Sequence, residues 1–115
     1  MKSIQAVKAL AALAQESRLA IFRLLVERGP DGLSAGAVGD ELGIAPATLS
    51  FHFKELANAG LVVARARGRF VIYSADFLTM TDLLGFLTDN CCGGNPCMGG
   101  SAHAPQRESK DAAKV

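Results

Sequence analysis

The chain has 115 residues, 50% of them hydrophobic, and its 12 basic and 11 acidic side chains give a formal charge of +1. This length predicts a single domain, and the hydrophobic content argues against an intrinsically disordered chain. The total charge does not indicate a nucleic-acid partner, but its distribution does. One short stretch carries four basic side chains, Lys54, Arg65, Arg67 and Arg69, and a single acidic one, Glu55. A local basic patch of this kind is expected of a nucleic-acid-binding surface.

The cysteine content and the hydrophobic runs indicate the compartment. All three cysteines lie in one short segment, and an odd, bunched set does not make a secreted disulfide framework. Reduced thiols fit a cytosolic protein better. No stretch approaches the roughly 18 apolar residues of a membrane helix, and the apolar run near the N-terminus, about six residues, is too short for a signal peptide. We therefore expect a soluble, cytoplasmic protein with no membrane partner.

The first two predicted helices cover residues 3–14 and 16–28. In both, apolar side chains recur at the spacing of an amphipathic helix. Gly29 and Pro30 end the second helix, because both residue types break helices. The side chains that define the pattern are Ile4, Val7, Leu10, Ala11 and Ala14 in the first helix and Ile21, Phe22, Leu24 and Leu25 in the second.

The next two predicted helices are joined by a tight turn. Ser34 is a suitable N-cap for the third helix, which ends near Leu42, where Gly43 supplies a left-handed residue. Pro46 suits the first turn of the fourth helix, and Gly60 ends it. A helix, a tight glycine turn and a second helix form the helix-turn-helix arrangement. The apolar stripe of the fourth helix consists of Leu49, Phe53 and Leu56.

The pattern then becomes that of strands. Residues 61–66 and 69–74 are rich in β-branched and apolar side chains around Arg67-Gly68, which predicts a hairpin. A final helix is predicted over residues 76–90, with Met80, Leu83, Leu84 and Leu87 on one face. The expected fold class is mainly α with a small β-hairpin: a winged helix-turn-helix with four helices, the hairpin and a fifth helix. Its core is too small to cover the apolar stripes of the outer helices, so we expect a homodimer paired through the terminal helices.

The cysteines Cys91, Cys92 and Cys97 form the candidate metal site. Two neighbouring thiols, a Gly/Asn turn and a third thiol can converge on one atom. Thiolates select soft metals such as copper(I) or zinc, and trivalent arsenic and antimony follow the same logic. These metalloids carry a lone pair, so three sulfur ligands in a pyramid satisfy them.

Other interpretations of the same cysteines remain open. Incidental buried thiols are one, although Gly, Asn and Pro surround them and offer no apolar core. A redox sensor is another, but a disulfide between Cys91 and Cys92 would be strained. Structural zinc needs four ligands, and only Asp89 and His103 are nearby candidates. Three thiolates around a metalloid match the segment better.

Two stretches resemble the ArsR/SmtB family of winged-helix repressors: Glu41 to Leu56, which reads Glu-Leu-Gly-Ile-Ala-Pro-Ala-Thr-Leu-Ser-Phe-His-Phe-Lys-Glu-Leu, and Ala59-Gly60-Leu61-Val62. Residues 16–25 are similar to the second helix of that family, and residues 65–73 resemble its wing. The resemblance extends over about residues 4–90. It implies a homodimer that sits on palindromic operator DNA and releases it when a metal ion or other ligand binds.

The resemblance also bears on the inducer. The best-known arsenic-sensing members of the family carry a Cys-x-Cys in the third helix, whereas residues 38–42 here read Val-Gly-Asp-Glu-Leu. A subgroup with a vicinal cysteine pair and a third cysteine after the last helix is similar to this chain, and its members respond to trivalent arsenic and antimony. The resemblance therefore implies As(III) or Sb(III) as the inducer, with no organic cofactor.

Candidate DNA-contacting residues lie on the fourth helix and on the hairpin. Steps of 100° place Ala47, Phe51 and Lys54 opposite the apolar stripe, with Thr48 and Ser50 at the edges of that face. In a major groove, Phe51 could contact thymine methyl groups, and the other side chains could contact base edges or phosphate. The alternative for this helix is one that merely packs.

Two further candidate DNA contacts are less direct. His52 lies beside the apolar stripe and fits a packed histidine or a phosphate contact better than a base reader. Arg65, Arg67 and Arg69 could enter a narrow minor groove, or they could form a solvated hairpin tip.

These observations predict a transcriptional repressor and no enzyme, since no nucleophile–base pair or phosphate loop is present. Residues 1–90 would form the DNA-binding and dimerisation domain, 91–98 the cysteine segment and 99–115 a flexible tail. The expected partners are double-stranded operator DNA and a second copy of the chain. Two alternatives remain: the same fold sensing zinc, cadmium or oxidants, and a metalloid-binding or protein-interaction module that does not bind DNA.

Overall fold

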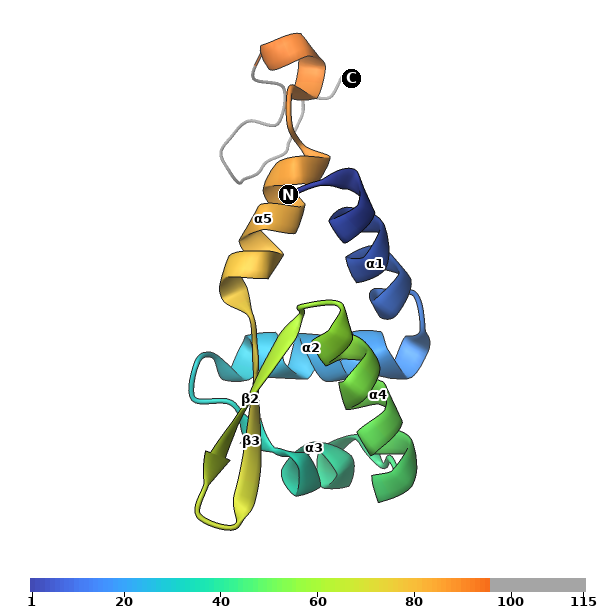
Figure 1. Ribbon diagram of the computed structural model, residues 1–115, viewed down its shortest axis with the longest axis vertical. Coiled ribbons are helices and arrows are strands. Elements are labelled where there is room, and N and C mark those ends of the chain that lie inside the picture. Colours follow the sequence, from blue (N-terminus) through green and yellow to red (C-terminus); the bar gives the residue numbers. More distant parts are fainter. Residues whose placement is uncertain (96–115) are drawn as a thin grey trace, which may run out of the picture.

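The computed structural model describes residues 1–95. Figure 1 shows two groups of elements along the long axis of the molecule: α1 and α5 at one end, and α3, α4 and the β2–β3 hairpin at the other, with α2 between them. In chain order the elements are α1 (Ser3–Leu13), α2 (Glu16–Arg28), β1 (Leu33–Ser34), α3 (Ala35–Leu42), α4 (Pro46–Asn58), β2 (Val62–Arg67), β3 (Phe70–Ala75), α5 (Phe77–Leu87) and the 3-10 turn η1 (Cys91–Gly94). The predicted winged helix-turn-helix is confirmed.

The core lies where α2 meets α3, α4 and the sheet. Its apolar side chains come from the stripes that the sequence indicates for α2 and α4, joined by one residue of α3 and one that follows α4. Burying such side chains stabilises the fold by about 1.5–3 kcal/mol each. The largest side chains with almost no exposed surface are Phe53, Ile21, Leu25, Leu56, Leu61 and Val38.

Local signals set the ends of α3 and α4. The Ser34 hydroxyl accepts a hydrogen bond of 3.2 Å from the backbone N–H of Ala37, which caps α3. Gly43 ends this helix in the left-handed conformation, with φ 68°, and Pro46 occupies the first turn of α4. The turn between the two helices is therefore encoded locally.

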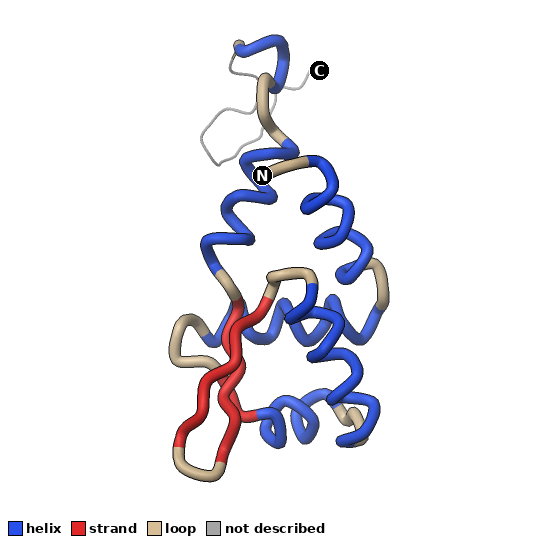
Figure 2. Tube along the Cα trace, in the orientation of Figure 1, coloured by secondary structure: helices blue, strands red, loops and turns tan. Residues whose placement is uncertain are grey.

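The sheet has three strands in the order β1-β3-β2, all antiparallel (Figure 2). The hairpin register pairs Arg67 with Phe70, so the two turn residues are Gly68 and Arg69, one position later than predicted. Gly68 has φ 61°, which favours glycine at a turn position of this kind. Strand β1 was not predicted, because two residues carry no alternating pattern and pair only through their contact with β3.

The terminal helices leave much of their apolar stripes exposed, as expected for a core too small to cover them, and α5 is shorter than predicted. In α1 the buried face consists of Ala6, Ala9 and Ala12, while Ile4 is 70% and Val7 63% exposed. Ile4 and Val7 are thus largely uncovered within this chain, whereas Leu13 at the end of α1 packs against the core. In α5 the helix ends at Leu87, three residues earlier than predicted.

The early end of α5 has a local cause. The hydroxyl and the backbone N–H of Thr88 both donate to the carbonyl of Leu84, at 2.8 and 3.2 Å, and Asn90 then adopts φ 57°, the left-handed region, so the right-handed helix does not continue. Within residues 1–95, none of the helices has the length and apolar character that a membrane span requires.

Candidate nucleic-acid interface

Helix α4 presents one apolar face to the core and one polar face to solvent. Leu49, Phe53 and Leu56 are buried, as the stripe predicts. The predicted outer face is exposed throughout: Ala47, Thr48, Ser50, Phe51 and Lys54 all lie at the surface. Phe51 is 55% exposed and lies on the face of the helix opposite the buried stripe. Such a side chain is available for contact with a partner surface.

His52 is the one candidate on α4 that is buried, with 6% of its surface exposed. Its Nδ1 lies 3.4 Å from the Nη1 of Arg18, a residue of α2. Its ring also lies against Phe51, with centroids 5.7 Å apart. The histidine therefore packs under the helix, the alternative favoured over base reading, and is not on the outer face.

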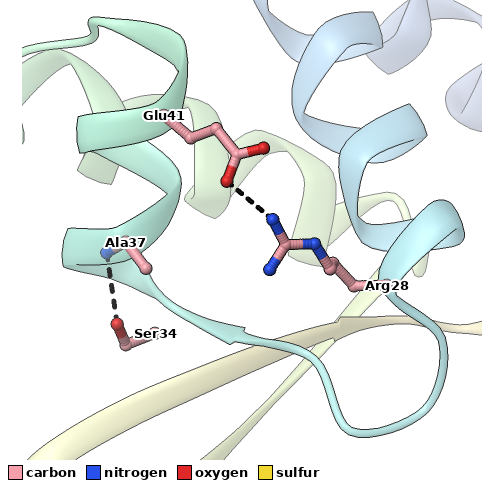
Figure 3. Close-up of polar contacts among 4 residues, drawn as sticks. All are labelled: Arg28, Ser34, Ala37 and Glu41. Atoms are coloured by element: carbon pink, nitrogen blue, oxygen red, sulfur yellow. Dashed lines mark hydrogen bonds and ion pairs between the residues drawn. The ribbon is translucent and has the colours of Figure 1, made fainter.

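The position of α4 is fixed by close contacts with α3. A Cβ at Gly39 would lie 3.0 Å from the carbonyl oxygen of Ile44 and 3.2 Å from Leu49, so glycine allows the turn and α4 to approach α3. On the other side of α3, Glu41 forms an ion pair of 2.8 Å with Arg28 at the end of α2 (Figure 3). Both side chains of this pair are about half exposed, so it stabilises the arrangement only weakly.

The hairpin carries the other basic candidates. Arg65, Arg67 and Arg69 are all exposed. However, an Nη atom of Arg65 donates a hydrogen bond of 2.7 Å to the backbone carbonyl of Asp31, in the turn before β1. Arg65 therefore ties the hairpin to the body of the molecule, whereas no hydrogen bond or ion pair within residues 1–95 involves the side chain of Arg67 or Arg69. Phe70 at the hairpin tip is also 60% exposed.

An open pocket of about 350 Å³ lies between α3, α4 and the two long strands. Ser50 and Lys54 of α4 line one side, Asp40 of α3 another, and Ala64 and Tyr73 of the strands the third. The ring of Tyr73 stacks on that of Phe53. The helix and the hairpin are therefore held next to each other, with basic side chains on both.

The cysteine segment follows α5 directly. Cys91 and Cys92 belong to η1, and their Sγ atoms lie 3.7 Å apart, too far for a disulfide between them. Cys92 is disulfide-bonded in the structure. Asn90 and Cys92 have φ of 57° and 56°, the left-handed region that residues other than glycine seldom occupy. The chain therefore turns sharply here and brings the two sulfur atoms to one side.

Cys97 and His103 lie outside the described residues. Within residues 1–95, no three His, Cys, Asp or Glu side chains come together as metal ligands. The predicted three-cysteine site therefore depends on Cys97 joining the pair at η1.

Two polar partners of the candidate residues were not predicted. Arg18 contacts His52, and the carbonyl of Asp31 accepts from Arg65; both contacts join residues 34 positions apart. The sequence offers no periodic signal for contacts of this kind, since they depend on how α2 packs against the rest of the fold.

Comparison with known proteins agrees with this geometry. A helix-turn-helix domain family model matches residues 13–65. The chain is 45% identical over 78 residues to the uncharacterized HTH-type transcriptional regulator YceK of Bacillus subtilis, an alignment that covers 66% of this chain and 76% of YceK.

Solved structures with the same fold include two regulators. HlyU from Vibrio cholerae is 30% identical, with a TM-score of 0.62, and the match covers 78% of this chain and 95% of HlyU. An ArsR-like transcriptional regulator from Rhodococcus is 25% identical, with a TM-score of 0.65, and the match covers 73% of this chain and 76% of that regulator. These relatives are transcriptional regulators and not enzymes. The chain belongs to the ArsR-like winged-helix family of helix-turn-helix, DNA-binding transcriptional regulators.

Proposed function

We propose that this regulator is a repressor that responds to arsenite and antimonite. It binds operator DNA as a homodimer without metalloid and releases it when As(III) or Sb(III) binds the thiolates of Cys91, Cys92 and Cys97. The observation that carries the proposal is the 3.7 Å separation of the Cys91 and Cys92 Sγ atoms at the end of α5. All three cysteines of the sequence lie in this segment and none lies in α3, so it is the one place where thiolates could gather.

The binding chemistry is a ligand exchange in the reduced protein, after a thiol reductant has opened the disulfide of Cys92 and left three thiols. Arsenous acid, As(OH)₃, exchanges three hydroxyl groups for three cysteine sulfurs, and the three thiol protons leave with the hydroxyls as three water molecules. Two sulfurs already lie on one side of η1, so they supply a chelating pair. A third sulfur a few residues along the chain completes a pyramidal site without a second protomer.

The proposed DNA contacts follow from the exposed face of α4 and the hairpin. Helix α4 would enter the major groove, with Phe51 against thymine methyl groups and Thr48 and Ser50 at base edges or phosphate. Ala47 would lie close to the bases, and Lys54 would neutralise phosphate. Arg67 and Arg69 would extend to the adjacent minor groove. The buried ring of His52 would support α4 from its inner side and would not contact the bases.

The proposed dimer uses the apolar faces that α1 and α5 leave uncovered. Ile4, Val7 and Leu10 on α1 are 70%, 63% and 42% exposed. Leu84 and Leu87 on α5 are 57% and 55% exposed. A second copy of the chain would bury both sets about a two-fold axis. The winged helix-turn-helix domain of Mb0332 from Mycobacterium bovis, which shares the fold at 24% identity, is homodimeric.

The position of η1 suggests how metalloid binding is communicated. The segment lies directly beyond α5, next to the end of the molecule where α1 and α5 lie together (Figure 1). Closing the cysteine segment around a metalloid would shift the C-terminal end of α5, which lies in the proposed dimer interface. That shift would change the distance between the two α4 helices. A typical coupling of about 1–3 kcal/mol lowers operator affinity by about 5–150-fold.

The test uses reduced full-length protein and an operator selected from random duplex DNA. We expect arsenite to release the protein from DNA, and Cys91→Ser, Cys92→Ser and Cys97→Ser each to bind DNA normally but to resist release. Asn95→Ser, in the same segment, is the matched control and should respond as the wild type does. X-ray absorption should find three sulfur atoms around bound arsenic. Normal release in all three cysteine variants would refute the proposed site.

The disulfide at Cys92 favours one second candidate, an oxidant-responsive repressor with the same fold and the same DNA-binding surface. In that case peroxide, and not arsenite, would release the operator, and a thiol reductant would restore binding. Zinc or cadmium in the same titration tests the remaining metal alternatives. Lack of salt-dependent retention on duplex DNA would instead indicate a module that binds metalloid or protein only.

A further inference from the structure

Arg18 in the first turn of α2 contacts two other helices. Its Nε donates a hydrogen bond of 2.7 Å to the backbone carbonyl of Ala12, in the last turn of α1. Its Nη1 lies 3.4 Å from the Nδ1 of His52, in α4. The backbone N–H of Arg18 donates to the side chain of Gln15, the N-cap of α2, at 2.8 Å. One guanidinium group on a fixed backbone thus bridges α1 and α4.

Both acceptors need this partner. The carbonyl of Ala12 is among the last four of α1, which have no donor within their own α-helix. The imidazole of His52 is almost fully buried, where a polar nitrogen without a hydrogen bond is costly. The neutral tautomer with its proton on Nε2 is the form in which Nδ1 accepts from the guanidinium. The guanidinium of Arg18 therefore provides a hydrogen-bond donor to an acceptor on each of two helices.

The rest of the α1 packing gives little directional control. The buried face of α1 consists of Ala6, Ala9 and Ala12, and one larger side chain, Leu13, packs against the core at the end of the helix, so most of this contact is made by methyl groups. Burial of methyl groups is favourable but non-directional, and small side chains do not interlock as large ones do. A planar guanidinium, in contrast, has donors in a rigid fork and fixes the direction of each bond.

We propose that Arg18 is a positioning residue that transmits the orientation of α1 to α4, and so sets the relative position of the two α4 helices in the dimer. The inference rests on the proposed homodimer, in which α1 lies at the two-fold axis. Arg18 and His52 would thus determine which half-site spacing the dimer prefers. A contact that only stabilised the fold would not have this effect.

The test compares four full-length variants. Arg18→Gln removes the fork, Arg18→Lys keeps the charge without the fork, and His52→Leu removes the acceptor with a buried apolar side chain. The double variant Arg18→Gln/His52→Leu completes a cycle. Arg23→Gln, an exposed arginine of the same helix, is the matched control. Sedimentation and urea unfolding establish that each variant remains folded and dimeric.

The readout is affinity for the selected operator and for the same operator with one base pair inserted between its half-sites. The insertion rotates one half-site by about 35°, since a turn of DNA has about 10–10.5 base pairs. Wild type and Arg23→Gln should lose about 10–100-fold on insertion. Both Arg18 variants and His52→Leu should bind the native operator about 10-fold more weakly, the loss typical of a hydrogen bond to a charged group. For these variants, the inserted base pair should lower the affinity by only about 3-fold or less. The double variant should bind both duplexes as the single variants do.

If the variants lose affinity equally for both duplexes, the effect of the insertion is unchanged. That result would show that Arg18 only stabilises α4 and would overturn the inference. If wild-type protein binds no DNA, the proposed function fails, and hydrogen exchange without DNA tests the bridge by itself. Arg18→Gln should then raise exchange in peptides covering residues 8–14 and 49–56 together. An increase confined to the first peptide would show that no coupling reaches α4.

Discussion

The rings of Phe53 and Tyr73 stack with their centroids 3.8 Å apart and their planes 9° from parallel, which joins α4 to β3. Phe53 is almost fully buried and Tyr73 is half-buried, so the pair lies at the edge of the core. The stack sets the angle between the helix that would enter the major groove and the hairpin that would follow the minor groove. The two surfaces that would meet one duplex are thus linked in part through an aromatic contact.

Replacing Tyr73 should affect both stability and DNA binding. We expect Tyr73→Leu to lower the free energy of unfolding by about 1–2 kcal/mol, because an aromatic pair contributes about 0.5–1.5 kcal/mol beyond the area that it buries. Operator affinity should also fall, since the hairpin loses its fixed angle to α4. Urea unfolding and DNA titration measure the two effects. Val71→Thr, an exposed position on the same strand, should change neither, and unchanged affinity in Tyr73→Leu would refute the link.

Two glycines with nearly the same positive φ should respond differently to alanine. Gly32 and Gly43 have φ of 72° and 68°. A Cβ at Gly32 would run into the backbone carbonyl of Tyr73, whereas a Cβ at Gly43 would meet nothing within 4 Å. Gly43→Ala should therefore cost only the left-handed backbone penalty, about 1–2 kcal/mol. Gly32→Ala should cost about 1–3 kcal/mol more, because the turn before β1 must move. Equal losses in urea unfolding would contradict this account.

The salt dependence of DNA binding should identify the phosphate contacts. Lys54→Ala, Arg67→Ala and Arg69→Ala should each reduce the slope of log K against log salt by about 1. Arg65→Ala should reduce it less, since the Arg65 guanidinium is already bonded to the carbonyl of Asp31. Lys8→Ala, on α1 at the other end of the molecule, is the control and should leave the slope unchanged. A full reduction in Arg65→Ala would mean that this bond is given up on DNA.

Phe51 should recognise the methyl group of thymine. Its exposed ring contributes little to the core, so Phe51→Ala should change the free energy of unfolding by no more than about 0.5 kcal/mol. An operator with deoxyuridine in place of thymine lacks the methyl group. It should bind wild type about fourfold more weakly, from about 0.8 kcal/mol per buried methyl-sized group. The Phe51→Ala variant should bind both operators equally. A persistent preference for thymine in the variant would assign the contact to another residue.

The apolar faces of α1 and α5 should hold the dimer together. Ile4→Asp, Leu84→Asp and Leu87→Asp each place a charge where an apolar side chain is more than half exposed in the single chain. We expect wild-type protein to sediment as a dimer at micromolar concentration and these variants to sediment as monomers, because an unpaired charge at an interface core is costly. Val63→Asp, an exposed apolar position on β2, should remain dimeric. Dimers in all three interface variants would place the two-fold axis elsewhere.

The sequence alone determined where the helices of the DNA-binding half begin and end. Ser34, Gly43 and Pro46 act on their own neighbours through capping, a left-handed turn and a fixed φ, so their effect needs no distant partner. The exposed face of α4 followed from periodicity for the same reason. The clustering of Cys91 and Cys92 was likewise a matter of chain position, and the role of the segment with Cys97 stays a prediction.

Only the tertiary structure decided which face of α1 is buried, because both its alanine face and its large apolar face fit a helix, and the neighbouring helices select between them. Strand β1 exists only by pairing with β3. The bonds from Arg18 to His52 and from Arg65 to Asp31 each join residues 34 positions apart. Contacts of this kind arise when separate elements pack, and the pattern within a single element carries no signal for them.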